Sequence, residues 1–171
     1  MTYDEISADS SIEDKISWAA DSYQKYRNVL TGDKEIRHLI EKFHFASSES
    51  LHEMIKIGLV DECRKCEEDE GGACCGKGIE NRYSGTLLLI NLMLGVKLPE
   101  RAFDPKSCFF LGTKGCSLSA RHVICINYIC KKITDRIPIQ EINLLREKEG
   151  TELDILFSLN EKVKYVLRNI K

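Results

Sequence analysis

Apolar residues recur at helical spacing along the first part of the chain. From Ile12 to Leu30 they follow one another at alternating intervals of four and three, which is typical of one face of a helix. A serine at position 10 or 11 offers a capping side chain before this face, and Gly32 is placed to end it. Asp33 is placed to cap a second helix, whose apolar face consists of Ile36, Leu39, Ile40 and Phe43. Ser50 with Glu53 predicts a capping box for a third helix.

The second half of the chain predicts further helices. Residues 84–94 are apolar nearly all round and predict a buried helix that Gly95 ends. A short helix fits over residues 119–128, and Pro138 can sit in the first turn of another. The tail repeats an apolar seam at Leu156, Leu159, Val163, Val166 and Ile170. This seam fits either a coiled-coil contact, in a homodimer or with a protein partner, or a core-facing helix. The second is favoured because the repeat lasts only two heptads.

The stretch 63–78 lacks apolar periodicity and is rich in charge, glycine and cysteine, which predicts a loop. No clear alternating strand is seen. The sequence therefore predicts a mainly α fold with a single domain over residues 1–171. Within it, residues 1–60 form N-terminal helices, residues 61–133 an irregular cysteine-rich metal-binding core, and residues 134–171 C-terminal helices.

Composition and charge narrow the classes of function. The net charge is −2 and the pI about 6.1, so no bulk basic charge predicts nucleic-acid binding. The acidic N-terminus lacks the apolar segment of a secretory signal, and the longest apolar run is too short to span a bilayer. We therefore expect a cytoplasmic protein that contacts neither nucleic acid nor membrane.

The cysteines are the main chemical signal, because all eight lie between residues 63 and 130. Cytosolic thiols are held reduced, so clustered cysteines there favour metal binding over stable disulfides or unrelated redox thiols. The candidate ligands are Cys63, Cys66, Cys74, Cys75, Cys108, Cys116, Cys125 and Cys130.

Several features around these cysteines fit a metal site. Cys63 and Cys66 form a C-x-x-C pair, the spacing of many zinc and iron–sulfur sites. Glycines around the adjacent pair Cys74 and Cys75 allow the chain to wrap closely around an ion. Arg121 is the strongest candidate to offset the negative charge of thiolates. His122 is a less favoured nitrogen ligand, since eight thiols already exceed one four-coordinate site.

The order of these motifs resembles the YkgJ-like family, whose CxxCxxCC signature is associated with zinc or iron chelation. The matching pieces are G72-A-C-C75, C108-F-F-L111, C116-S-L118, R121-H-V-I-C125 and Y128-I-C130. Here the first two cysteines stand further from the adjacent pair than in the family, and His122 and Ile129 stand where proline is usual. The resemblance implies a metal-chelating protein of undefined biochemical activity.

Three functions remain open from the sequence. The preferred one is a module that binds Zn²⁺, since all-thiolate sites suit this ion. The alternative is an iron or iron–sulfur protein with an electron-transfer or sensing role. The least favoured is a thiol enzyme with Cys74 or Cys75 as the nucleophile, because only His122 lies near in sequence to serve as a base.

Overall fold

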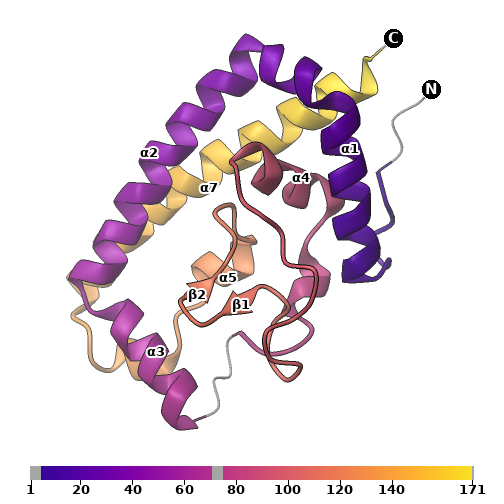
Figure 1. Ribbon diagram of the computed structural model, residues 1–171. Coiled ribbons are helices and arrows are strands. Elements are labelled where there is room, and N and C mark those ends of the chain that lie inside the picture. Colours follow the sequence, from indigo (N-terminus) through magenta and orange to yellow (C-terminus); the bar gives the residue numbers. More distant parts are fainter. Residues whose placement is uncertain (1–4, 71–74, 171) are drawn as a thin grey trace.

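The computed structural model describes residues 5–70 and 75–170, although the side chains of Arg64 and of residues 66–70 lie outside this description. Helix accounts for 65% of the structure and strand for 4%, which confirms the predicted mainly α class (Figure 1). No helix in the described ranges is both long enough and apolar enough to cross a membrane. The elements follow in the order α1 (Ile12–Gly32), α2 (Lys34–Lys56), α3 (Leu59–Glu70), the 3₁₀ helix η1 (Ile79–Arg82), α4 (Gly85–Met93), β1 (Leu111–Gly112), β2 (Gly115–Cys116), α5 (Val123–Asn127), α6 (Lys131–Thr134) and α7 (Ile139–Arg168).

The predicted start of α1 and the boundary between α1 and α2 are confirmed. The hydroxyl of Ser11 accepts a hydrogen bond from the Asp14 N–H at 3.1 Å, and α1 ends at Gly32. The carboxylate of Asp33 then accepts from the N–H groups of Glu35 and Ile36, which begins α2. These side chains pair backbone N–H groups that have no partner within the first turn of a helix.

The predicted break before a third helix at Ser50 is wrong, because α2 continues without interruption to Lys56. Ser50 is fully buried in the middle of α2, where its hydroxyl donates to the Glu152 carboxylate of α7. The chain turns only at Gly58, whose φ of +75° is a conformation that favours glycine.

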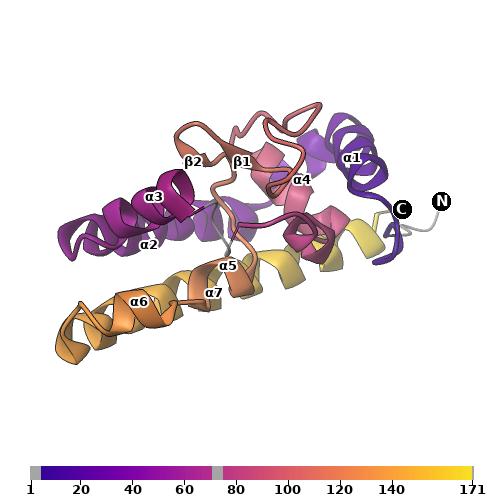
Figure 2. The same ribbon diagram turned by 90° about the horizontal axis from the view of Figure 1, so that it is seen from below.

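Helices α2 and α7 pack side by side along much of their length and form the long side of the molecule (Figures 1 and 2). The predicted core-facing role of the C-terminal seam is confirmed, since Leu156, Leu159 and Val163 are buried. Beyond these apolar residues, the interface buries three carboxylates, which belong to Glu53, Glu149 and Glu152.

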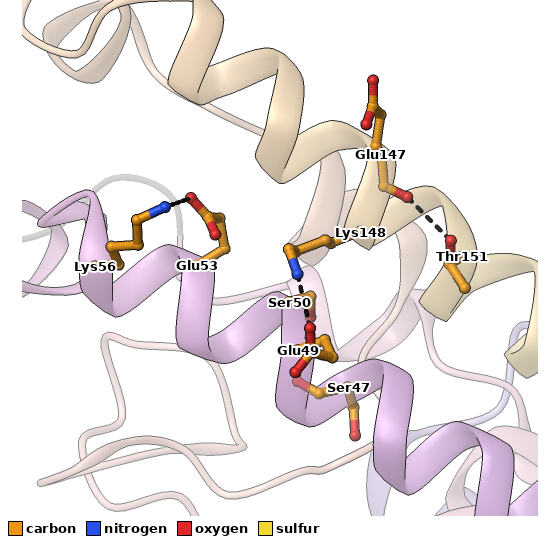
Figure 3. Close-up of polar contacts among 8 residues, drawn as sticks. All are labelled: Ser47, Glu49, Ser50, Glu53, Lys56, Glu147, Lys148 and Thr151. Carbon is orange, nitrogen blue, oxygen red and sulfur yellow. Dashed lines mark hydrogen bonds and ion pairs between the residues drawn. The ribbon is translucent and has the colours of Figure 1, made fainter.

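Figure 3 shows polar contacts along the same interface. Lys148 of α7 reaches the Glu49 carboxylate of α2 at 2.7 Å, and within α2 Lys56 pairs with Glu53 at 2.9 Å. Within α7, Arg146 pairs with Glu149 at 2.8 Å, a pair that Figure 3 does not draw. Each carboxylate buried between the two helices thus has a hydrogen-bonding partner, as buried charges require.

Helix α4 is the buried centre of the main core, as predicted. Ser84 caps it, and the exposed fraction of every residue from Leu87 to Asn91 is 8% or less. Its first residue, Gly85, touches α1 so closely that a Cβ there would lie 2.6 Å from the Trp18 ring. Gly95, with φ of +81°, follows the end of the helix.

The predicted loop over residues 63–78 is wrong in its first half, because α3 extends through Cys63 and Cys66 to Glu70. Asp61 and Glu62 lie in its first turn, where carboxylates favour a helix start. The charged residues that follow are good helix formers, so this helix forms without an apolar stripe.

A second, smaller core joins α3 to the region of α6 and the start of α7. It contains Leu59, Ile133, Ile137, Ile142 and Leu145. The chain between α4 and α6 is mostly irregular, as predicted, although it includes the short β1–β2 hairpin. Helix α5 in this segment is shorter than the helix expected over residues 119–128. In both ribbon views this hairpin lies between α3 and α4 (Figures 1 and 2).

Candidate metal centre

Backbone hydrogen bonds join three of the cysteine-bearing segments. Gly76 and Ser107 form an antiparallel bridge, and the Cys108 N–H donates to the Cys75 carbonyl at 2.7 Å. Past Cys108 the chain turns into the hairpin, in which Leu111 pairs with Cys116. Cysteines that stand far apart in the sequence are thereby held on neighbouring strands of chain.

The thiols of Cys116 and Cys125 lie near the buried phenol of Tyr83, and charge on either one acts on it. Tyr83 is only 1% exposed, and its hydroxyl donates to the Cys125 sulfur at 3.8 Å. Burial raises the pKa of Tyr83 above its ordinary value, and negative charge on Cys116 or Cys125 raises it further. The phenol is therefore protonated at neutral pH and is able to donate a hydrogen bond to sulfur.

The sulfurs of Cys108, Cys116 and Cys125 also lie within electrostatic range of one another. Burial raises the pKa of the Cys108 thiol to about 11, and charge on Glu80, Cys116 or Cys125 acts in the same direction. Burial likewise raises the pKa of the Cys116 thiol, and charge on Cys125 adds to the effect. As a residue, Cys116 is exposed to solvent, whereas Cys108 is buried.

Two of the thiols accept a hydrogen bond from a backbone N–H two residues further on. The Phe110 N–H bonds to the Cys108 sulfur and the Leu118 N–H bonds to the Cys116 sulfur, and each lowers the pKa of its thiol against the effect of burial. Hydrogen bonds of this kind stabilise the thiolate, which is the form that binds a metal. The backbone thus favours the thiolate form of Cys108 and Cys116, whereas burial favours the neutral thiol.

Arg121 lies between the thiols and the α2–α7 interface. One of its guanidinium nitrogens lies 3.8 Å from the Met54 sulfur of α2. Its positive charge lowers the pKa of the Cys116 thiol and also that of the Glu149 carboxylate on α7. Arg121 therefore lies near the Cys116 thiol, and its predicted role beside metal-bound thiolates stays a prediction.

His122 is committed to a structural contact. Its Nδ1 accepts a hydrogen bond from the Ile124 N–H at 3.2 Å and so caps α5. In this arrangement the lone pair of Nδ1 serves the cap, and the proton of the neutral ring lies on Nε2. Burial, and then the charge of Arg82, lower the pKa of His122, so the neutral ring is favoured.

Asn91, buried in α4, holds the segment that leads to Arg121 and Cys125. Its side-chain nitrogen donates to the Ala120 carbonyl at 2.9 Å, and its side-chain oxygen accepts from the N–H groups of Ser119 and Ala120, each at 3.0 Å. Three backbone groups of an irregular segment are thus paired by one amide. Through this contact the buried helix fixes the position of the chain entering the thiol region.

The remaining predicted ligands lie elsewhere or outside the description. Cys130 is partly buried against the second core, and Cys63 is exposed on α3. Cys66 lies in α3 with its side chain outside the described residues, and Cys74 lies outside them altogether. Within the described part of the chain, no three His, Cys, Asp or Glu side chains form a ready-made metal-binding group.

Tyr83 and Asn91 were not predicted as part of this region from the sequence. For Asn91 there was a signal, because it is a lone amide in an otherwise apolar run. For Tyr83 there was none, since nothing near it in sequence indicates that the Cys125 sulfur lies beside its hydroxyl.

Comparison of the chain with protein-family models, curated proteins and solved structures gives no match. The resemblance to the YkgJ-like family therefore stays a prediction.

Proposed function

We propose that this protein binds a thiophilic metal ion, preferably Zn²⁺, through a thiol centre that comprises Cys75, Cys108, Cys116 and Cys125. The observation that supports this most is that the last three thiols, which come from separate segments, lie within electrostatic range of one another, and that the Cys125 sulfur also accepts a hydrogen bond from Tyr83. Cys75 joins them through its backbone bond to Cys108. Four cysteines from separate turns are a common ligand set for structural zinc.

The electrostatics of the thiol centre support an ion rather than a purely apolar role for these side chains. Burial raises the pKa of the Cys108 and Cys116 thiols, yet a backbone N–H favours each thiolate, and Arg121 also favours that of Cys116. A divalent cation supplies the missing attraction and displaces the thiol protons on binding. The thiol centre would close around the ion, because its side chains do not form a ready-made group in the described residues.

The remaining predicted ligands are Cys63, Cys66, Cys74 and Cys130. The ion pair between Glu62 and Arg136 ties α3, which carries Cys63 and Cys66, to the segment that follows Cys130. These three cysteines are therefore candidates for a second ion, and Cys74 for the first. Their metal binding stays a prediction.

Metal analysis of anaerobically purified, untagged protein tests the proposal. We expect stoichiometric zinc in the wild type, and a lower metal content with a lower melting temperature in Cys108→Ser and Cys116→Ser, because metal binding is linked to folding. Ser117→Ala is the matched control, since Ser117 is an exposed hairpin neighbour of Cys116. Unchanged metal content in both cysteine variants would remove the thiol centre from the proposal.

An iron–sulfur cluster is the second candidate. It is favoured by the apolar wall beside Cys108, where Phe109 and Phe110 are buried and their rings meet edge to face with centroids 5.6 Å apart. Such surroundings limit water at a cluster, and hydrogen bonds to its sulfurs tune its potential. Brown protein with broad visible absorption and bound iron would favour the cluster, whereas colourless protein with bound zinc would favour the first candidate.

A further inference from the structure

The hydroxyl of Tyr83 is held in one orientation beside the thiol centre. The Tyr83 ring packs edge to face on Phe110, with centroids 5.1 Å apart and an interplanar angle of 61°, and it tilts against His122 at 5.8 Å. The residue follows directly after η1, and the next residue, Ser84, caps α4. A buried ring that packs on two other rings, in a residue placed between two helices, has little freedom to turn its hydroxyl elsewhere.

The hydrogen bonds of this hydroxyl give it a direction. Its oxygen accepts from the His122 N–H at 3.1 Å, and its proton is donated to the Cys125 sulfur at 3.8 Å. A distance of 3.8 Å is long for this contact. Hydrogen bonds to a charged acceptor are shorter and stronger than those to a neutral one, so the contact gains strength when the thiol becomes a metal-bound thiolate.

From this geometry we propose that Tyr83 is a positioning residue for the metal ligand Cys125, which its hydroxyl orients and partly neutralises in the bound state. This inference rests on the proposed function. Groups that hydrogen-bond to a metal ligand fix its orientation, and their loss weakens metal binding by about 10- to 100-fold. Tyr83 would do this from the core, whereas the N–H groups of Phe110 and Leu118 serve the other two thiols.

Tyr83→Phe tests the inference because it removes the hydroxyl and keeps the ring. We expect Zn²⁺ affinity, measured by competition with a chromophoric chelator, to fall by about 10-fold. In protein loaded with Co²⁺, the sulfur-to-cobalt charge-transfer band should shift, since the electron density on the Cys125 sulfur changes. Tyr23→Phe, at a partly buried tyrosine of α1 that packs on the same core, is the matched control and should leave both measurements unchanged.

A merely structural role for the hydroxyl predicts a different pattern. Tyr83→Phe also leaves the His122 N–H without its partner, and that loss lowers the stability of metal-free and metal-loaded protein equally. Wild-type Zn²⁺ affinity and an unmoved Co²⁺ band in Tyr83→Phe would therefore overturn the inference.

A double-mutant cycle tests the link to Cys125 directly. In a Cys125→Ser background, Tyr83→Phe should cost no further affinity, whereas in a Cys108→Ser background it should still do so. Equal losses in both backgrounds would overturn the assignment to Cys125. A wild-type protein that binds neither Zn²⁺ nor Co²⁺ would overturn the proposed function itself, and the two failures are therefore distinguishable.

Discussion

Replacing Asn91 by leucine should destabilise the fold by far more than one exposed polar substitution does. The change removes the partners of the Ala120 carbonyl and N–H, which are fully buried, and of the Ser119 N–H, which is partly buried. A buried backbone group left without a partner costs about 1–3 kcal/mol. The two Ala120 groups alone therefore cost about 2–6 kcal/mol, a large share of the 5–15 kcal/mol that is typical of whole domains.

The matched control is Asn160→Leu on α7. The side-chain oxygen of Asn160 is buried without a hydrogen-bond partner among the described residues, so the same replacement removes an unsatisfied acceptor. Its cost should be near zero, or the variant should be more stable than the wild type. The two variants share their change in size, so the difference between them isolates the hydrogen bonds of Asn91.

The measurement is urea unfolding followed by far-ultraviolet circular dichroism, in reductant and chelator so that metal binding does not contribute. We expect a lower midpoint for Asn91→Leu at an unchanged slope, because the surface exposed on unfolding stays the same. A loss of less than 1 kcal/mol, or one equal to that of Asn160→Leu, would refute the argument that Asn91 holds this segment. Asn91→Asp should be less stable than the wild type at neutral pH and recover as the pH falls, since only a protonated carboxyl can donate to the Ala120 carbonyl.

Further predictions concern packing, pH and metal. Gly85→Ala should lower the free energy of unfolding in urea by about 1–3 kcal/mol, because the new Cβ meets the Trp18 ring. Gly150→Ala should raise it by about 0.5–1 kcal/mol, because this glycine lies in mid-helix with open space around it. Equal effects of the two substitutions would contradict this prediction. Burial raises the pKa of the Glu149 carboxyl in the folded state above its ordinary value of 4.5. The folded state therefore binds this proton more tightly than the unfolded state, and the free energy of unfolding falls as the pH rises above 4.5. In urea unfolding at a series of pH values above 4.5, the stability of Glu149→Gln should rise relative to that of the wild type. A stability difference that does not change with pH would contradict this prediction. Removing bound metal with a chelator should lower the melting temperature of the wild type more than that of Cys116→Ser.

Capping residues and apolar faces were enough to predict a helix when one side of that helix packs against the core. Asp33 and the apolar residues of α1 and α4 therefore marked real elements. The same reasoning divided α2 at Ser50, because a serine followed by a glutamate after three residues looks like a helix start. In the folded chain α7 supplies the partner of Ser50, in Glu152, and no local pattern reveals a residue about 100 positions away.

The absence of an apolar stripe misled the prediction for α3. This helix packs into the second core through Leu59 and pairs with Arg136 through Glu62, and its charged residues have good helix propensity, so it forms without such a stripe. For the candidate site, clustering along the sequence indicated that the thiols act together. It gave no indication that Cys130 packs in a different core from Cys108, because that separation is set by tertiary packing.

The pairing of α2 with α7 has a consequence for how the chain folds. Every cysteine lies between these two helices in the sequence, so a chain growing from its N-terminus emerges with its thiols before the helix that closes the molecule exists. Contacts between such distant segments form late, because the intervening loop must first be brought together at an entropic cost. Until α7 docks, the face of α2 that it covers, which includes the buried Ser50, stays open to solvent.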